Sequence, residues 1–272
     1  MVDTENQDVQ ERYPLHRAAR ESSFESLKTL LESGKFNINE GTFDLVRPLH
    51  EACLAGSIDC VSLLLKHGAN VNLGNIDGAT ALCDACWIGS VECVQLLIDH
   101  GADVNPPFLF STPLHEAVFR DHWECVQLLV KKGACIDKSD CHYGTPLHVA
   151  ACKGHVKSAQ ELLRAGANPN ISKIHHTPLH EAARNQNFEL LLLLLEHGAN
   201  VYAQNNSGLT ARQLVPRAMS PCKQQLLDWE SFPRSLRHYC RLCIRTALGP
   251  KRLLRVDNLP LPKIVLRYLE HY

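Results

Sequence analysis

Long hydrophobic runs are missing from this sequence. The longest leucine run, Leu190 to Leu195, is far shorter than the roughly 20 apolar residues that a membrane helix needs. The first 12 residues are polar and charged and lack the apolar stretch of a secretory signal. We therefore expect no membrane partner and a cytoplasmic location, with a nuclear location as a further option.

Motifs of common catalytic sites are also missing. The sequence has no Gly-x-x-x-x-Gly-Lys-Ser/Thr phosphate loop, no Gly-x-Ser-x-Gly turn and no His-Glu-x-x-His helix. Because no residue pattern argues for catalysis, we expect a protein that is not an enzyme and that needs no catalytic residue, cofactor or metal.

Net charge is also nearly absent, at −1, but this value hides a split. Residues 232–272 carry nine Lys or Arg and two acids, a net charge of +7, whereas the other residues carry 19 bases and 27 acids, a net charge of −8. Such asymmetry predicts two modules with different partners. The basic residues lack an interleaved aromatic platform, so nucleic acid is not an expected partner.

A four-residue string, Thr-Pro-Leu-His or a variant of it, recurs along most of the chain. Its last position is spaced by 34, 33, 32, 33 and 32 residues, and it is occupied by His16, His50, Cys83, His115, His148 and His180. A Gly-Ala pair follows in the same phase, beginning at Gly68, Gly101, Gly133, Gly166 and Gly198. Two landmarks that keep phase over six copies indicate a repeat architecture.

The residues of each copy predict a pair of helices. Thr can cap the first helix, and Pro suits its first turn. Leu49, Ala52 and Cys53 then share one helical face, and the small residues allow close packing. Gly68 ends the second helix. The string resembles the ankyrin repeat, which implies an all-α solenoid of six repeats, followed by a partial terminal copy at 209–214.

The repeat alignment also explains most residues that could bind metal. Cys83 and Cys86 form a Cys-x-x-Cys, but they occupy columns that hold His50 and Cys53 in the preceding copy. The repeated histidines lie about 10 Å apart in a stack of paired helices, too far for one ion to bridge neighbours. We expect each of them to hydrogen-bond to a neighbouring repeat tip.

The variable positions of the repeats predict a target-binding surface. In ankyrin stacks, the two residues after the small pair of the first helix face the concave groove, and here they give an apolar patch flanked by basic residues. The tip at 105–111 combines two prolines with large apolar residues. The candidate target-binding residues are Trp87, Ile88, Phe119, Arg120, Lys153, Arg184, Phe108 and Phe110.

Beyond Val215 the repeat phase is lost, and residues 216–231 read as a linker with Pro216 and Pro221. An amphipathic helix follows, with Ser235 as its N-cap and Gly249 as its stop. Its arginines lie opposite the apolar stripe and read as a solvated face. The stripe consists of Leu236, Tyr239, Cys240, Cys243, Ile244, Ala247 and Leu248.

This terminal segment resembles the SOCS box. Leu236, Cys240 and Ile244 match its elongin-binding pattern, and Leu259, Pro260, Leu261 and Pro262 match its cullin-contacting segment. With the preceding repeats, the chain resembles the ankyrin-repeat and SOCS-box family. The expected domains are a polar tail at 1–12, ankyrin repeats at 13–215, the linker at 216–231 and the SOCS box at 232–272.

The resemblance implies a substrate-recognition subunit of an elongin-cullin-SOCS-box E3 ubiquitin ligase. Its implied partners are elongin C and elongin B, a cullin of the cullin-five type with its RING partner, and an unknown target that is ubiquitinated and degraded. The alternative is an ankyrin scaffold or inhibitor whose last helices cap the stack. Full burial of Leu236, Cys240 and Ile244 against residues 177–215 would favour that alternative.

Overall fold

The computed structural model describes residues 13–107, 111–173, 176–216, 220–231, 235–253, 262, 265–266 and 269. The chain divides into two compact units, residues 1–129 and 130–272, with α9 (Trp123–Lys131) running across the boundary. Throughout the described ranges the regular elements are helices, and extended pairing is limited to three isolated β-bridges. This architecture confirms the predicted all-α class.

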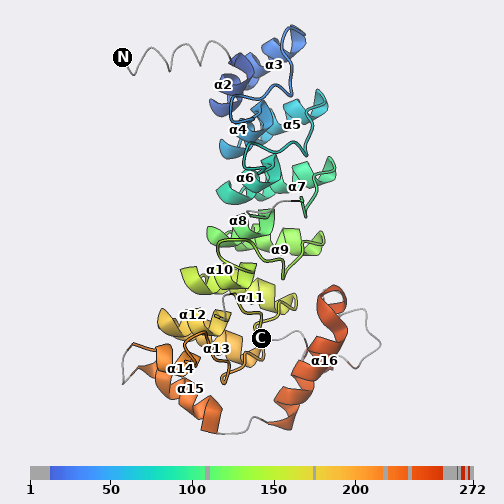
Figure 1. Cartoon of the computed structure of the whole chain (residues 1–272). Helices are drawn as coiled ribbons and strands as arrows, with labels where there is room; N and C mark the ends of the chain where they lie inside the picture. The colour runs from blue at the N-terminus through green and yellow to red at the C-terminus, as the bar shows by residue number, and fades with distance from the viewer. Residues whose placement is uncertain are drawn as a thin grey trace, which may run out of the picture. The chain divides into compact units, whose positions relative to one another are not determined.

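The first unit consists of paired helices in chain order (Figure 1). The first helix of each repeat packs on the first helix of the next, and each is followed by a second helix. The helices are α2 (Pro14–Arg20), α3 (Phe24–Glu32), α4 (Pro48–Leu54), α5 (Ile58–Lys66), α6 (Ala81–Ile88), α7 (Val91–Asp99) and α8 (Pro113–Phe119).

The second unit continues this pattern and adds the C-terminal helices. The helices α10, α12 and α14 pack on one another in turn, as first helices of their repeats. The elements are α10 (Pro146–Lys153), α11 (Val156–Arg164), α12 (Pro178–Arg184), α13 (Phe188–Glu196), α14 (Ala211–Leu214), α15 (Pro221–Ser231) and α16 (Leu236–Leu253).

The repeated string acts as a helix cap. In α10 the Thr145 hydroxyl contacts His148 Nδ1 at 2.8 Å, and the Thr145 backbone N–H donates to the same nitrogen at 3.2 Å. Since Nδ1 accepts, Nε2 carries the hydrogen and donates to the His176 carbonyl at 3.0 Å, in the tip that leads to the next first helix. The histidine therefore both caps its own helix and ties it to the next repeat.

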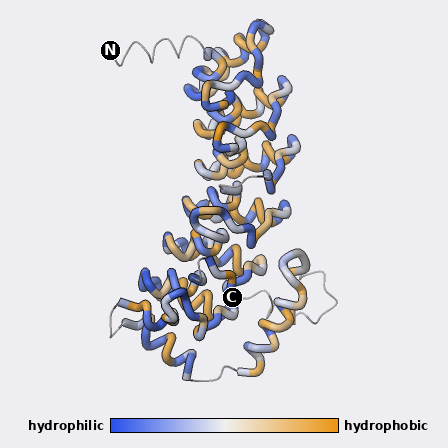
Figure 2. Tube along the Cα trace, in the orientation of Figure 1, coloured by the Kyte–Doolittle hydropathy of each residue, from blue (hydrophilic) through white to orange (hydrophobic). Residues whose placement is uncertain are grey.

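Each helix buries one face, as the spacing of apolar residues predicts. Leu49, Ala52 and Cys53 are all buried in α4, and Val61 and Leu64 are buried in α5. Figure 2 shows the matching alternation of hydrophobic and hydrophilic residues along the helices. Gly68 then turns the chain with φ +87°, a value that strains any residue with a Cβ. The cores of the units are thus stacked layers of small and branched side chains.

The range predicted to be a linker contains a helix. Helix α15 covers Pro221–Ser231, buries Cys222 and Leu226, and packs on α13 and α14. The physical reason is that Pro221 occupies the first helical position, where its missing N–H costs nothing. With α14, it gives the partial terminal copy a second helix.

Candidate functional site

Helix α16 carries the residues predicted to bind elongin, and it presents them to solvent. Its N-terminus is capped by Ser235, whose Oγ accepts from the His238 N–H at 3.3 Å. Leu236 is 79% exposed, Ile244 is 39% exposed and Cys240 is also exposed. These three side chains lie one turn apart along a single face. The burial that would favour a simple capping helix is not found at these residues.

The opposite face of α16 is buried, although it carries arginines. Arg241 is 2% exposed and Arg245 is 8% exposed, so the expectation of a solvated arginine face is wrong for both residues. Leu242 on the same side lies beside Gly198, at the end of the preceding repeat helix. The helix therefore packs on the repeat helices of its own unit through the side that carries the arginines and leaves its apolar side outward, the reverse of the usual arrangement.

Arg245 explains this orientation. Its Nη2 donates to the carbonyls of Leu163 and Arg164 at 2.8 and 3.0 Å, at the C-terminal end of α11. Its Nη1 donates to the Leu269 carbonyl at 2.6 Å. A cation suits the negative end of a helix dipole, where the last carbonyls of the helix lack their usual intrahelical donors. Burial, and then Arg241, lower the pKa of Arg245 to about 10, which keeps the guanidinium charged at neutral pH.

The segment predicted to contact a cullin is described only in part. Leu259, Pro260 and Leu261 lie outside the described residues, whereas Pro262 is exposed. The Pro262 carbonyl accepts from the Val265 and Leu266 N–H groups at 2.8 and 3.1 Å, which begins a helical turn.

The predicted target-binding residues of the first unit lie together. The rings of Trp87 and Phe119 stack with centroids 5.6 Å apart and planes 18° apart. The Arg120 guanidinium lies 3.8 Å from the centre of the Trp87 ring, and Ile88 beside it is 41% exposed. Trp87 and Phe119 are half-buried. Phe108 and Phe110 lie outside the described residues.

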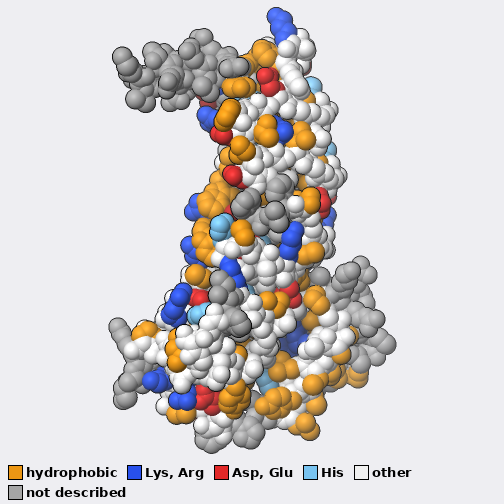
Figure 3. Space-filling view, in the orientation of Figure 1, with side chains coloured by type: hydrophobic (Ala, Val, Ile, Leu, Met, Phe, Trp, Pro, Cys, Tyr) orange, Lys and Arg blue, Asp and Glu red, His pale blue; other side chains and the backbone are white. Residues whose placement is uncertain are grey.

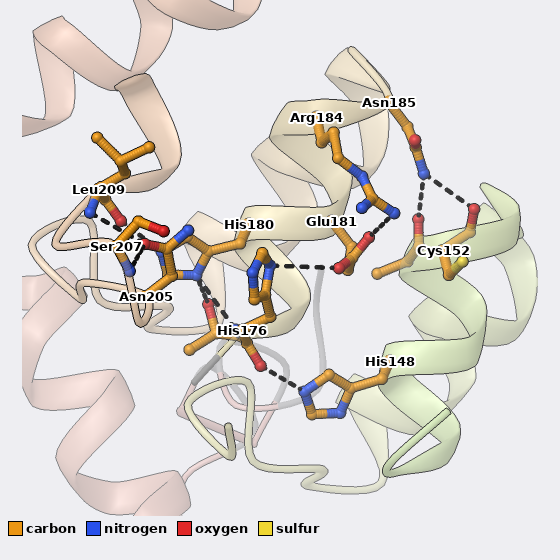
Figure 4. A network of polar contacts seen from close by, with 12 residues as sticks. His148, Cys152, His176, His180, Glu181, Arg184, Asn185, Asn205, Ser207 and Leu209 are labelled. Atoms are coloured by element: carbon orange, nitrogen blue, oxygen red, sulfur yellow. Dashed lines mark hydrogen bonds and ion pairs between the residues drawn. The ribbon is translucent and has the colours of Figure 1, made fainter. Parts of the chain in front are cut away.

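Lys153 and Arg184 belong to the second unit, and both are exposed. Arg184 forms an ion pair with Glu181 at 2.5 Å, and Glu181 also lies 3.4 Å from His176 Nδ1 (Figure 4). Glu181 and Arg184 line a cavity of about 320 Å³. This cavity was not predicted from the sequence, and its other lining residues are His142, Tyr143, His148, Cys152, Lys173 and His176.

The buried cysteines and histidines are held in uncharged forms. Burial raises the pKa of the Cys83 thiol to about 12 and lowers the pKa of His50 to about 4. All twelve cysteines are free thiols. Among the described residues, no group of three or more His, Cys, Asp or Glu side chains is arranged to hold a metal ion. In the same residues, no helix is long and apolar enough to cross a bilayer.

Asp84 and Arg245 were also not predicted from the sequence as functional residues. Asp84 lies one turn before Trp87 on α6, and burial, with Glu116 and Glu51, raises its pKa to about 8. The signal for Asp84 was its place in a column that also holds Glu51 and Glu116. The signal for Arg245 was weaker, since spacing shows which residues share a face but not which face is buried.

Family models match almost the whole repeat region and the C-terminal segment. Ankyrin-repeat models match residues 15–108, 106–173 and 162–215, and the SOCS box model matches residues 232–270. The SOCS box match includes all of α16. The two predicted kinds of module are therefore both present, in the predicted order.

Comparisons with individual proteins agree with these matches. The chain is 40% identical to mouse ankyrin repeat and SOCS box protein 5 over 261 residues, which cover 96% of this chain and 79% of the mouse protein. It is 42% identical to mouse ankyrin repeat and SOCS box protein 9 over 167 residues, 61% of this chain and 57% of that protein.

Solved structures give the same result for the fold. The crystal structure of the human ASB11 ankyrin repeat domain covers 82% of this chain and 99% of its own, with a TM-score of 0.75 and 39% identity. The ankyrin repeat domain of Bcl-3 covers 79% of this chain and 97% of its own, with a TM-score of 0.67 and 28% identity. The chain belongs to the ankyrin repeat and SOCS box family, which supports, in general terms, a role as a substrate adaptor of a SOCS-box ubiquitin ligase.

Proposed function

We propose that this chain is the substrate-recognition subunit of an elongin-cullin-SOCS-box E3 ubiquitin ligase. The single observation that carries the proposal is the outward apolar face of α16, with Leu236 at 79% exposure. A helix that buries Arg241 and Arg245 and exposes Leu236 gains stability when a partner covers its apolar side. Burying one large aliphatic side chain contributes about 2 kcal/mol.

Elongin C is the proposed occupant of this face. Leu236 inserts into an apolar pocket of elongin C, while Cys240 and Ile244 pack beside it, which is recognition of a helix in a groove. Helix α16 is already folded and held by Arg245 in the free chain, so binding does not carry the entropy cost of ordering it. Elongin B joins through elongin C.

The segment from Leu259 to Pro262 is the proposed cullin contact, with a cullin of the cullin-five type. The RING partner of the cullin brings a ubiquitin-charged conjugating enzyme, so this chain supplies no catalytic group. Its contribution is to hold a target near that enzyme, where the raised effective concentration drives ubiquitin transfer and then degradation of the target.

The target itself is proposed to bind the ankyrin repeats. In the first unit, the stacked Trp87 and Phe119 with Arg120 and Ile88 have the aromatic and arginine composition of binding hot spots. In the second unit, the exposed Arg184 lines the cavity described above, and the exposed Lys153 lies 6.0 Å from the ring centre of Tyr143, which also lines it.

Co-purification tests the elongin step. The wild-type chain, expressed with elongins B and C, should bring both down in stoichiometric amount, and the double variant Leu236→Ala with Cys240→Ala should lose them. The matched control is Leu227→Ala, which truncates a leucine of α15 that is 41% exposed and lies outside the motif. Equal recovery of elongins with the wild type and the double variant would sink the ligase proposal and favour a scaffold or inhibitor.

A further inference from the structure

A row of carboxylates runs along the first helices of the first unit. Glu51 on α4, Asp84 on α6 and Glu116 on α8 occupy the same repeat position, and these helices pack in order. Each acid is followed three residues later by a large apolar side chain, so acid and apolar residue share a face. Figure 3 shows acidic side chains interspersed with hydrophobic ones over α2, α4 and α6. The apolar residues are Leu54, Trp87 and Phe119.

The chain itself shows how this row takes up a cation. Arg20, the last residue of α2, donates from Nε to Glu51 Oε2 at 2.9 Å and from Nη2 to Glu51 Oε1 at 2.5 Å. This two-pronged contact is the strong geometry for a guanidinium on a carboxylate. Arg20 occupies in its repeat the position that Leu54 occupies in the next. A basic residue one repeat earlier thus neutralises Glu51.

Asp84 lacks the equivalent partner. The corresponding position one repeat earlier holds Leu54, and among the described residues the Asp84 carboxylate makes no hydrogen bond or ion pair. Burial disfavours its charged form, and so do Glu116 on α8 and Glu51 on α4, which raises its pKa to about 8. Ionisation of this half-buried acid is therefore costly for the free chain, and an external cation would relieve that cost.

Exposed apolar side chains lie on the same helices as the acids of this row. Leu54 and Ile88 are each 41% exposed, and the stacked rings of Trp87 and Phe119 continue the row. A bare metal ion fits poorly, because the described residues hold no cluster arranged to ligate one. A Lys or Arg side chain from an extended polypeptide fits both features, since its aliphatic stem covers apolar surface while its charged end reaches the carboxylate.

We propose that this face, which we call the Asp84 face (Leu54, Asp84, Trp87, Ile88 and Phe119), binds a segment of a protein partner that places a Lys or Arg against Asp84 and an apolar residue on Leu54 and Ile88. The proposal rests on the target-binding role proposed above and specifies the chemistry of the target segment. Because binding converts a protonated carboxyl into a carboxylate paired with a cation, it releases a proton to the buffer at neutral pH.

Selection from a random-sequence peptide library displayed on phage tests the proposal with the full chain. The wild type should enrich peptides with a basic residue beside an apolar one. For a synthesised peptide from the enriched set, the Asp84→Asn substitution should lower the affinity at least about tenfold. Asp59→Asn, which removes an exposed acid of α5, should leave the affinity unchanged. Calorimetry in buffers of different ionisation enthalpy should detect proton release with the wild type and none with Asp84→Asn.

Folding and binding are separable in this test. Asp84→Asn is nearly isosteric and removes a carboxylate whose charged form is disfavoured by desolvation, Glu116 and Glu51, so its melting temperature should equal or exceed that of the wild type at pH 8. A lower melting temperature would show that Asp84 is a structural residue. Failure to enrich basic peptides, or equal affinity of the wild type and Asp84→Asn for the synthesised peptide, would overturn the proposal.

The result is also independent of the ligase proposal. Asp84→Asn should co-purify with elongins B and C as the wild type does, and the double variant Leu236→Ala with Cys240→Ala should select the same basic peptides. If the wild type fails to bind elongins but selects basic peptides, the ligase proposal fails. If the wild type binds elongins but selects no basic peptides, the proposal for the Asp84 face fails.

Discussion

Individual histidines link neighbouring repeats while remaining neutral. His16, His50, His148 and His180 each contact a carbonyl of the following tip through Nε2, at 2.9 to 3.3 Å. Burial lowers the pKa of all four, and that of His50 to about 4. These bonds could be predicted from the sequence, because a histidine occupies the same position in five of the six copies.

These lowered pKa values predict a loss of stability in acid. Below pH 6.5 the histidines of the unfolded chain become protonated, whereas those of the folded chain stay neutral until the pH approaches their lowered pKa. The free energy of unfolding therefore falls as the pH decreases from 6.5 to about 4. His50→Gln should make this decline shallower by about 1 kcal/mol per pH unit. Gln is a suitable replacement because Gln213 accepts from the Thr210 N–H in the terminal copy. Urea titrations at pH 7 and 5 measure the slopes, and identical slopes would contradict this explanation.

Arg245 is the residue on which the position of α16 depends. Arg245→Ala removes the guanidinium that donates to the carbonyls of Leu163, Arg164 and Leu269, which should cost about 1 to 3 kcal/mol. Arg245→Lys should recover only part of this loss, because one ammonium lacks the planar fork of a guanidinium. Thermal melting of the full chain gives the ranking, with exposed Lys66→Ala as the control. An unchanged melting temperature for Arg245→Ala would mean that these contacts do not hold the helix.

At the scale of helices, the repeat pairs could be predicted because the caps, glycines and apolar spacing agree in each copy. Helix α15 was missed, since Pro216 and Pro221 read as breakers and the terminal copy lacks the Gly-Ala landmark. The outward face of α16 matched the motif, but its buried arginines were not predicted. The spacing of apolar residues predicts which side chains share a face of α16, whereas the carbonyls at the end of α11 decide which face packs inward.

Helix α15 provides a matched pair of leucines that tests whether it is part of the fold. Leu226 is fully buried and Leu227 is 41% exposed. Leu226→Ala should destabilise the chain by about 2 to 5 kcal/mol, whereas Leu227→Ala should change its stability by less than about 0.5 kcal/mol. Denaturant titration separates the two variants. If both substitutions leave the free energy of unfolding unchanged, residues 216–231 behave as a linker, as the sequence predicted.

At the scale of the whole molecule, the chain combines ankyrin repeats, which we propose bind a target, with a terminal helix whose exposed apolar face we propose binds elongin C. The family membership could be predicted from the sequence, because two motifs occur in order. The chemistry of the target surface could not, since it depends on which acid of the row lacks a basic neighbour. Glu51 has Arg20 one repeat earlier, whereas the corresponding position before Asp84 holds Leu54.

Thiol labelling of Cys240, read by mass spectrometry, tests the central claim most directly. Cys240 lies on the outward face of α16, and exposed Cys135 lies outside the SOCS box and serves as an internal control. In the free chain both should react with a maleimide. After addition of purified elongin B–C complex, Cys240 should be protected at least about tenfold while Cys135 is unchanged. An inert Cys240 in the free chain, or equal labelling with and without elongins, would contradict the account.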